Sequence, residues 1–235
     1  AATGSIEAPA DAKAAPAPAT PAPNVVVREL AKGVWFLAGQ SHHSVVVAFA
    51  DRLVLIEAPQ SEARSQAVIA KARELAPLPL THLVMSHHHF DHTAGLRAAI
   101  AEGLTVVSHP GNEAFVKTMA ARAFTRQPDA LARAAKPVTV ETVVDSRTIS
   151  DGKRSLVIYP VEGNPHSETM LMAYLPNERL LVEVDAFSPG GTYHPYAANL
   201  LGHVERLKLR VDRVVPLHGE VVPYKDLVAA ARPAA

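Results

Sequence analysis

Four histidines and one carboxylate fall within seven residues of this chain, in the stretch SHHHFDH at positions 86–92. The chain has 12 histidines in 235 residues, so a third of them lie here. The stretch follows the apolar run THLVMS, which is typical of a buried strand. Imidazole and carboxylate groups gathered at a strand end favour a divalent metal site. The alternative is a solvated histidine-rich loop in which Asp91 caps the next helix.

The composition limits the chemistry and the partners of such a site. The chain has no cysteine, which excludes disulfides, thiolate nucleophiles and cysteine-ligated zinc. Lys plus Arg equals Asp plus Glu, 23 against 23, and this balance disfavours nucleic acid and anionic membrane surfaces as partners. No apolar run approaches the roughly 20 residues of a membrane span, so no membrane insertion is expected. We therefore expect a small-molecule partner and a metal held by histidine and carboxylate.

The chain is predicted to divide into a leader and one folded domain. Residues 1–24 are mostly alanine and proline, which is typical of a flexible or polyproline-like segment. Residues 25–235 are expected to form a single domain. The absent initiator Met fits either a removed signal peptide or an upstream domain. The alanine- and proline-rich start slightly favours a periplasmic or secreted protein over a cytoplasmic one.

Strand and helix patterns alternate along the predicted domain. Short β-branched runs such as VWFLA, SVVVAFA and RLVLIEA predict strands joined by tight turns. Apolar residues at helical spacing predict helices over 61–76, 93–101, 113–124, 129–134 and 196–209. The chain thus has two halves, and in each half a strand-rich meander is followed by alternating helices and strands. Two sheets packed between outer helices would satisfy this order.

Three downstream residues offer the ligands that the short stretch lacks. One turn cannot direct four ligands around a single ion, because a tetrahedral site needs ligands from several directions. The stretch therefore indicates two ions that share one turn. His166 lies in the turn GNPHSET, Asp185 ends the run LLVEVD, and His218 ends VVPLH. A carboxylate at the end of an apolar run is costly to bury unless it is paired or coordinated.

Taken in order, these residues resemble the signature of the metallo-β-lactamase superfamily. Its motif His-x-His-x-Asp-His stands here as His87, His89, Asp91 and His92, and its downstream ligands match His166, Asp185 and His218. The resemblance covers Val25 to Leu227 and implies an α/β fold, the αββα sandwich of two mixed β-sheets flanked by helices. It also implies the ligand sets. The first metal would be held by His87, His89 and His166, the second by Asp91, His92 and His218, and Asp185 would bridge them.

The resemblance implies hydrolysis at two divalent ions. Ions about 3.5 to 4 Å apart can activate a bridging hydroxide, so that no side-chain nucleophile is needed. Asp91 would orient this hydroxide and take its proton. Imidazole with carboxylate suits two zinc ions first, while iron or manganese stay open.

Other residues near the predicted site support or line it. Two groups either contact substrate or belong to plain surface loops: His42 and His43 in GQSHHS, and Tyr193, His194 and Tyr196 in SPGGTYHPY. Glu57 ends the strand RLVLIE and would support the metal site from behind. His88 occupies an x position of the motif and is expected to point away from the metals, in a supporting or structural role.

We predict a dinuclear zinc-dependent hydrolase that uses a metal-bridging hydroxide on a small-molecule ester, lactone, thioester or amide. The loop after Asp185 has no lysine or arginine to anchor a substrate carboxylate, so at most weak β-lactamase activity is expected. The alternative is a mononuclear iron dioxygenase of the persulfide dioxygenase type, with iron at His87, His166 and Asp185. A third reading is a metal-binding protein without turnover, against which the complete ligand set argues.

Overall fold

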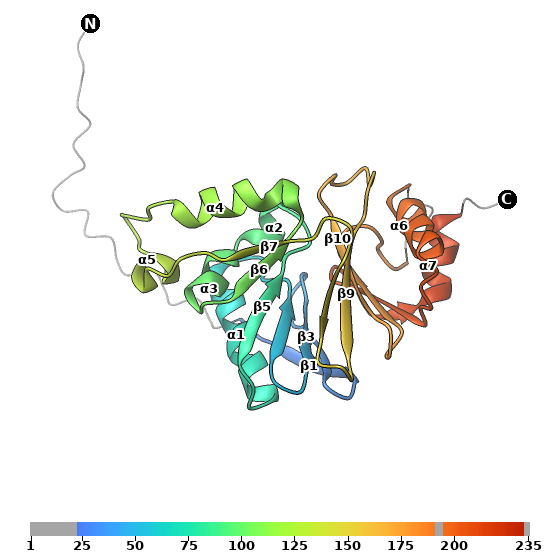
Figure 1. Cartoon of the computed structure of the whole chain (residues 1–235), viewed down its shortest axis with the longest axis horizontal. Helices are drawn as coiled ribbons and strands as arrows, with labels where there is room; N and C mark the ends of the chain where they lie inside the picture. Colours follow the sequence, from blue (N-terminus) through green and yellow to red (C-terminus); the bar gives the residue numbers. More distant parts are fainter. Residues whose placement is uncertain (1–22, 191–194, 233–235) are drawn as a thin grey trace, which may run out of the picture.

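Two β-sheets pack face to face in the computed structural model, which describes residues 23–190 and 195–232 (Figure 1). Helices α1, α3, α4 and α5 cover the outer face of the first sheet, and α6 and α7 cover the outer face of the second. The αββα sandwich predicted from the sequence is thereby confirmed. The leader predicted over 1–24 lies outside the described residues, except for 23 and 24. Within the described ranges, no helix is long and apolar enough to cross a membrane.

The first sheet has the spatial order β1-β2-β3-β4-β5-β6-β7, and the second has the order β13-β12-β11-β10-β9-β8. The strands of the first sheet are β1 Val26–Ala31, β2 Val34–Ala38, β3 Ser44–Ala48, β4 Leu53–Ile56, β5 Leu80–Val84, β6 Thr105–Ser108 and β7 Val140–Thr142. Those of the second are β8 Arg147–Ser150, β9 Ser155–Pro160, β10 Leu171–Leu175, β11 Leu180–Glu183, β12 Arg213–Pro216 and β13 Val222–Pro223. The helices are α1 Glu62–Leu75, α2 Phe90–Thr93, α3 Leu96–Ala101, η1 Pro110–Asn112, α4 Glu113–Ala121, α5 Ala130–Ala134, α6 Pro195–Arg206 and α7 Tyr224–Ala231.

The strand directions bring several chain segments to one edge of the sandwich. In the first sheet β4, β5, β6 and β7 run parallel, and in the second sheet β12 runs parallel to β11. The two sheets meet where β5 ends, because the backbone N–H of Leu171 in β10 donates to the carbonyl of Ser86 at 2.8 Å. The ends of β4, β5, β11 and β12 therefore lie at the same edge. This is the edge where α/β proteins usually place their ligands.

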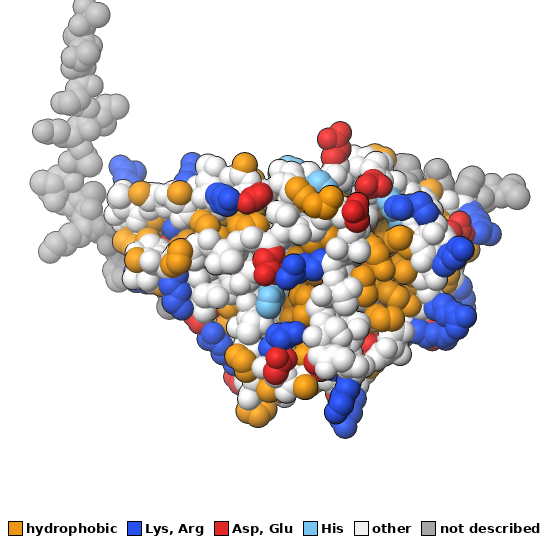
Figure 2. Space-filling view, viewed as in Figure 1, with side chains coloured by type: hydrophobic (Ala, Val, Ile, Leu, Met, Phe, Trp, Pro, Cys, Tyr) orange, Lys and Arg blue, Asp and Glu red, His pale blue; other side chains and the backbone are white. Residues whose placement is uncertain are grey.

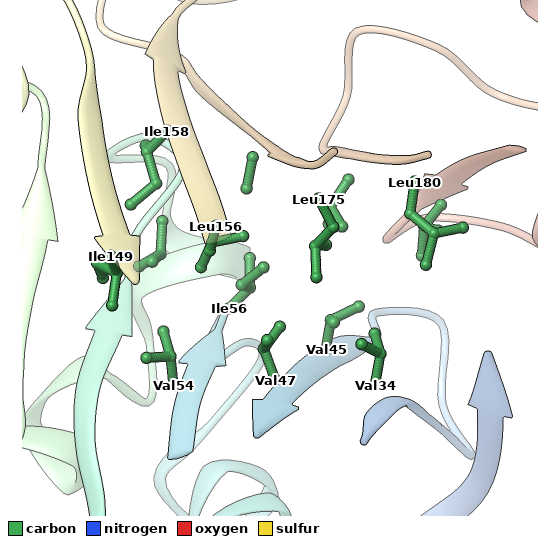
Figure 3. Close-up of a cluster of buried hydrophobic side chains, with 14 of the residues drawn as sticks. Val34, Val45, Val47, Val54, Ile56, Ile149, Leu156, Ile158, Leu175 and Leu180 are labelled. Carbon is green, nitrogen blue, oxygen red and sulfur yellow. The ribbon is translucent and has the colours of Figure 1, made fainter. Parts of the chain in front are cut away.

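The core between the sheets consists of alternate residues from facing strands. Val45 and Val47 of β3 and Val54 of β4 lie across the interface from Ile149 of β8, Leu156 of β9 and Leu175 of β10 in one buried cluster (Figure 3). Successive side chains of a strand point to opposite faces, so the residues between these contact the helices instead. Accordingly, the opposite face of the first sheet packs on residues of α1 and α3 in a second buried cluster. Burial on both faces explains why these strands read as continuous apolar runs.

The observed helices mostly follow the predicted ranges. The helix predicted over 61–76 begins after Ser61, whose hydroxyl accepts the N–H of Arg64 at 3.1 Å. The helix predicted over 93–101 is instead two short helices, α2 and α3, with Gly95 between them. Asp91 and His92 therefore lie inside α2 and not in a turn before a helix. Helix α7 was not predicted.

Polar contacts join the two sheets at the opposite edge, where β3 and β10 end. The guanidinium of Arg154 donates to the carbonyls of Ala48 and Lys32 and to Glu178 Oε1, the last at 2.8 Å. Nearby, Asp151 accepts the N–H of Ala50 at 2.6 Å. These contacts link the turn between β8 and β9 to the turns of the first sheet. Elsewhere acidic and basic side chains are interspersed over the face shown in Figure 2, as the balanced composition predicts.

Candidate metal centre

Two clusters of metal-ligating side chains meet at the edge where β4, β5, β11 and β12 end. Within each cluster the potential ligand atoms lie within 4.8 Å of one another. The first cluster contains His87, His89, His166 and Asp185, and the second cluster contains His42, Asp91, His92 and His218. The structure thus brings together all seven residues that the sequence predicted as ligands. It also adds His42, which was expected to contact substrate or to lie in a plain loop.

Both sheets contribute to these clusters. In the first sheet, His42 precedes β3, His87 and His89 follow β5, and α2 carries Asp91 and His92. In the second sheet, His166 precedes β10, Asp185 follows β11, and His218 follows β12. The centre therefore forms only when the two sheets pack together.

Asp185 lies between the clusters and touches histidines of both. Its Oδ2 is 3.0 Å from Nε2 of His166 in the first cluster and 3.0 Å from Nε2 of His92 in the second. The same oxygen is 3.3 Å from Nε2 of His87, and Oδ1 is 2.8 Å from Nε2 of His218. One carboxylate thus contacts four imidazoles, two from each cluster, which is the arrangement expected of a ligand that bridges two ions.

A buried glutamate shapes the turn that carries Asp185. Asp185 adopts a left-handed conformation with φ 63°, which aspartate tolerates better than most residues. Glu183, at the end of β11, accepts the N–H groups of Ala186 and Phe187, both at 3.0 Å from its Oε2. Its side chain therefore replaces the backbone acceptors that the turn lacks. Burial and the nearby Asp185 carboxylate raise the pKa of Glu183.

The imidazole nitrogens face one another at short range. Nε2 of His166 lies 3.3 Å from Nε2 of His87, and Nε2 of His218 lies 3.1 Å from Nε2 of His92. Two neutral nitrogens whose lone pairs point at each other repel, and a cation or a proton between them removes this repulsion. The donors are imidazole and carboxylate groups, which suit zinc and other divalent first-row ions. The residues present therefore fit the metals that the resemblance implies.

The charges of the site also favour a cation. Burial alone would raise the pKa of Asp185, but hydrogen bonds from His218, His87 and His92 hold it well below its usual range. Burial would lower the pKa of His92, but hydrogen bonds to Asp185 and Glu57 raise it to about 10. The Asp185 carboxylate thus stays ionised and attracts positive charge to the space between the two clusters.

Three histidines of the clusters have their outer nitrogen held by a neighbour. Nδ1 of His87 lies 2.9 Å from Ser86 Oγ, Nδ1 of His92 lies 2.8 Å from Glu57 Oε2, and Nδ1 of His42 lies 2.9 Å from Ser41 Oγ. Such contacts fix the ring so that Nε2 points into the cluster. Glu57 is at the place behind the site where the sequence predicted it, and its supporting role stays a prediction.

The other expected residues fall at different distances from the centre. His43 is buried, its ring packs 4.7 Å from that of Phe36, and it belongs to neither cluster found among the described residues. The ring of Tyr196 lies 5.6 Å from that of His166. Nδ1 of His88 lies 3.4 Å from Thr169 Oγ1, and His88 belongs to neither cluster found among the described residues. Tyr193 and His194 lie outside the described residues.

Two cavities adjoin the centre, and His88 contributes to the wall of both. The larger, of about 610 Å³, exposes mostly apolar atoms, including those of Phe90, Phe115, Met119 and Phe124, and polar side chains such as Arg97 and Asp129 also line it. The smaller, of about 450 Å³, is formed by residues 163–169, including the candidate ligand His166. Phe90 lies within the metal-binding motif itself and is 79% exposed. The apolar cavity is therefore next to the metal centre along the chain and in space.

A two-sheet sandwich with clustered histidine and aspartate ligands at one edge is the architecture of a metal-dependent hydrolase. The family model of the metallo-β-lactamase superfamily matches residues 37–224. The chain belongs to this superfamily, and the resemblance drawn from the motif is confirmed.

Solved structures with this fold include three metallo-β-lactamases. The enzyme from Pontibacter korlensis is 18% identical, with a TM-score of 0.68 over 88% of this chain and 97% of that one. The enzyme from Hirschia baltica is 16% identical, with a TM-score of 0.68 over 88% and 96%. FIM-1 from Pseudomonas aeruginosa, in its mono-zinc form, is 15% identical, with a TM-score of 0.68 over 88% and 93%. At these identities the likeness concerns the fold alone. A comparison with the curated proteins found no match.

Proposed function

We propose that this metal-dependent hydrolase is dinuclear, uses zinc, and cleaves a small-molecule ester, lactone, thioester or amide. The observation that carries the proposal is the position of Asp185, which contacts histidines of both clusters. His87, His89 and His166 would hold the first ion, and Asp91, His92 and His218 the second. Residues 25–235 would form the single domain that carries this centre.

The ions would supply a water of lowered pKa and a Lewis acid for the substrate carbonyl. The chain's own contribution centres on Asp91, whose side chain is 49% exposed and therefore accessible to substrate and water. Burial raises the pKa of Asp91, but the hydrogen bond from His42 and the charge of His92 hold it below its usual value. An ionised carboxylate at the open side of the centre is suited to orient a water and to take its proton.

The apolar cavity beside Phe90 supports a substrate with a hydrophobic acyl or aromatic group. Binding pockets for small molecules are mostly apolar with a few polar groups, and this cavity is of the usual size. A substrate whose apolar part lies between Phe90 and Phe115 would extend its polar part past His88 toward His166. Because lysine and arginine are absent from the loop after Asp185, β-lactams would be poor substrates.

Metal analysis tests this proposal most directly. Protein purified without added metal should contain about two zinc ions per chain, and Asp185→Ala and His218→Ala should lower this number. His88→Ala is the matched control and should keep both ions, because its imidazole belongs to neither cluster. The wild-type protein should then hydrolyse members of a panel of aryl esters, lactones and thioesters. One iron per chain that is indifferent to His218→Ala, together with oxygen uptake, would overturn the dinuclear hydrolase in favour of the dioxygenase.

A further inference from the structure

We propose that His42 is a metal ligand, the fourth from the second cluster, with its Nε2 as donor atom. The proposal rests on the dinuclear centre proposed above and defines its second ion site more closely. Nε2 of His42 lies 3.0 Å from Asp91 Oδ2. Its ring packs edge-on at 3.9 Å from that of His218 and lies 5.4 Å from that of His92. His42 thus faces every other member of the second cluster.

A chain of hydrogen bonds positions His42 in the same way as an expected ligand. Ser41 Oγ lies 2.9 Å from Nδ1 of His42, as Ser86 Oγ does from Nδ1 of His87. Ser41 Oγ in turn accepts the side-chain amide of Gln60 at 3.0 Å. With an ion bound, the Ser41 hydroxyl would accept Nδ1–H and leave the lone pair of Nε2 free to bind that ion. Nε2 of His42 and Oδ2 of Asp91 are then close enough to bind the same ion.

The backbone holds His42 beside the other segments of the second cluster. The N–H of His43 donates to the carbonyl of Leu217 at 2.9 Å, which ties the turn before β3 to the residue before His218. The N–H of Gln60 donates to the carbonyl of Asp91 at 2.7 Å, which ties the Ser41 contact to α2. The side chain of His42 is only 14% exposed, although it lies in a turn. Its position is therefore built into the fold.

The number of donors then differs between the two ion sites. With His42, the second site has three imidazoles, Asp91 and the shared Asp185, whereas the first has three imidazoles and Asp185. Sites filled by protein donors are structural in character, and catalytic sites keep a position open. We infer that the second ion is the more tightly enclosed one. The exchangeable position that a substrate needs would then belong to the first site.

Cobalt substitution tests the role of His42 independently of turnover. Each histidine that binds paramagnetic Co²⁺ keeps one exchangeable ring N–H, whose proton NMR signal is strongly shifted. The two clusters contain six histidines, so the dicobalt wild-type protein should show six such signals. His42→Ala should remove one of them and should weaken binding of the second Co²⁺ at least about tenfold in chelator competition. Binding of the first Co²⁺ should be unchanged, which also shows that the variant is folded.

A second variant separates a ligand from a mere hydrogen-bond partner of Asp91. His42→Gln keeps a side-chain amide that can donate to Asp91 but has no imidazole. It should lose the same NMR signal and the same Co²⁺ affinity as His42→Ala. Five shifted signals in the wild type, none lost in either variant, would overturn the proposal for His42 and leave the dinuclear centre intact. A wild-type protein that binds only one Co²⁺ would overturn both, while His88→Ala, the matched control, should retain all six signals.

Discussion

Glu57 and His92 form a buried pair beneath the metal centre, with 2.8 Å between Oε2 of the carboxylate and Nδ1 of the imidazole. Each side chain is only 1% exposed. The other carboxylate oxygen, Oε1, accepts the N–H of Ser86 at 2.7 Å. One glutamate therefore fixes both the ring of a candidate ligand and the backbone from which His87 projects. Glu57 itself adopts a left-handed conformation with φ 68°, so the strand end is shaped around this contact.

Glu57→Gln is expected to weaken binding of the second metal ion about 10- to 100-fold, because the amide cannot support the imidazole as a carboxylate does. Chelator competition with zinc measures this change. Glu220→Gln is the matched control, since Glu220 pairs with Arg28 on the exposed surface. Equal zinc affinity in the wild type and in Glu57→Gln would contradict a supporting role for Glu57.

Asp91→Asn is expected to lower kcat about 100-fold or more at full metal occupancy, because an amide cannot take a proton from water at neutral pH. The measurement compares kcat at saturating zinc, with metal content determined in parallel. Asp226→Asn, in the first turn of α7, provides a control outside the centre. Full turnover with both ions bound in Asp91→Asn would show that another group takes the proton.

Gly95→Ala is expected to destabilise the fold by about 1 to 3 kcal/mol, the usual cost of overpacking. A Cβ at this position would lie 1.7 Å from Ser65 Oγ and 2.8 Å from the carbonyl of Ala58, so α1 and α3 would have to separate. Gly202→Ala is the matched control: in α6, a Cβ would have nothing within 4 Å, and alanine favours the helix. Urea unfolding should therefore shift in opposite directions for the two variants.

Asp151 is expected to make stability depend on pH in the acid range. Hydrogen bonds from the backbone N–H groups of Arg154, Lys153 and Ala50 lower the pKa of its carboxyl to about 2 from 3.8. Because the folded state holds the ionised form, the stabilisation is complete above about pH 5 and is lost as the pH falls through 3.8 toward 2. Asp151→Asn should be less stable than the wild type at pH 7, and this difference should shrink at pH 3. Urea midpoints at pH 7, 5 and 3 measure it, and a difference that stays constant would contradict the assignment.

The seven residues predicted as ligands could be picked out from the sequence because most of them stand next to a strand with a clear apolar pattern. Asp185 and His218 end such runs directly, and the parallel pairing of β11 and β12 then places them side by side. Ser61 and Pro77 likewise bound the helix observed as α1. Signals of this kind depend only on residues nearby in the sequence, so they can be recognised without knowing which distant segments pack against them.

What the sequence did not predict depends on contacts between distant segments. Gly95 separates α2 from α3 because α1 approaches closely at Ser65, and no local pattern reports that approach. His42 joins the second cluster through the contact of its turn with Leu217 in the other sheet. A serine precedes both His42 and His87, but the dipeptide Ser-His also occurs at 108–109, outside the clusters, so no local signal in the sequence marked His42.

The guanidinium of Arg154 joins the two sheets at the edge remote from the metal centre, because it hydrogen-bonds both to Glu178, between β10 and β11 of the second sheet, and to the carbonyl of Ala48 in the first. Because these contacts do not involve the metal centre, loss of the ions would leave the two sheets packed together and the donor side chains near their present places. Ions would then enter a cavity that is already shaped, and little of their binding free energy would go into ordering the chain. Small zinc-dependent domains, by contrast, unfold when their ion leaves. In this protein the metal would serve the chemistry, and the architecture would exist without it.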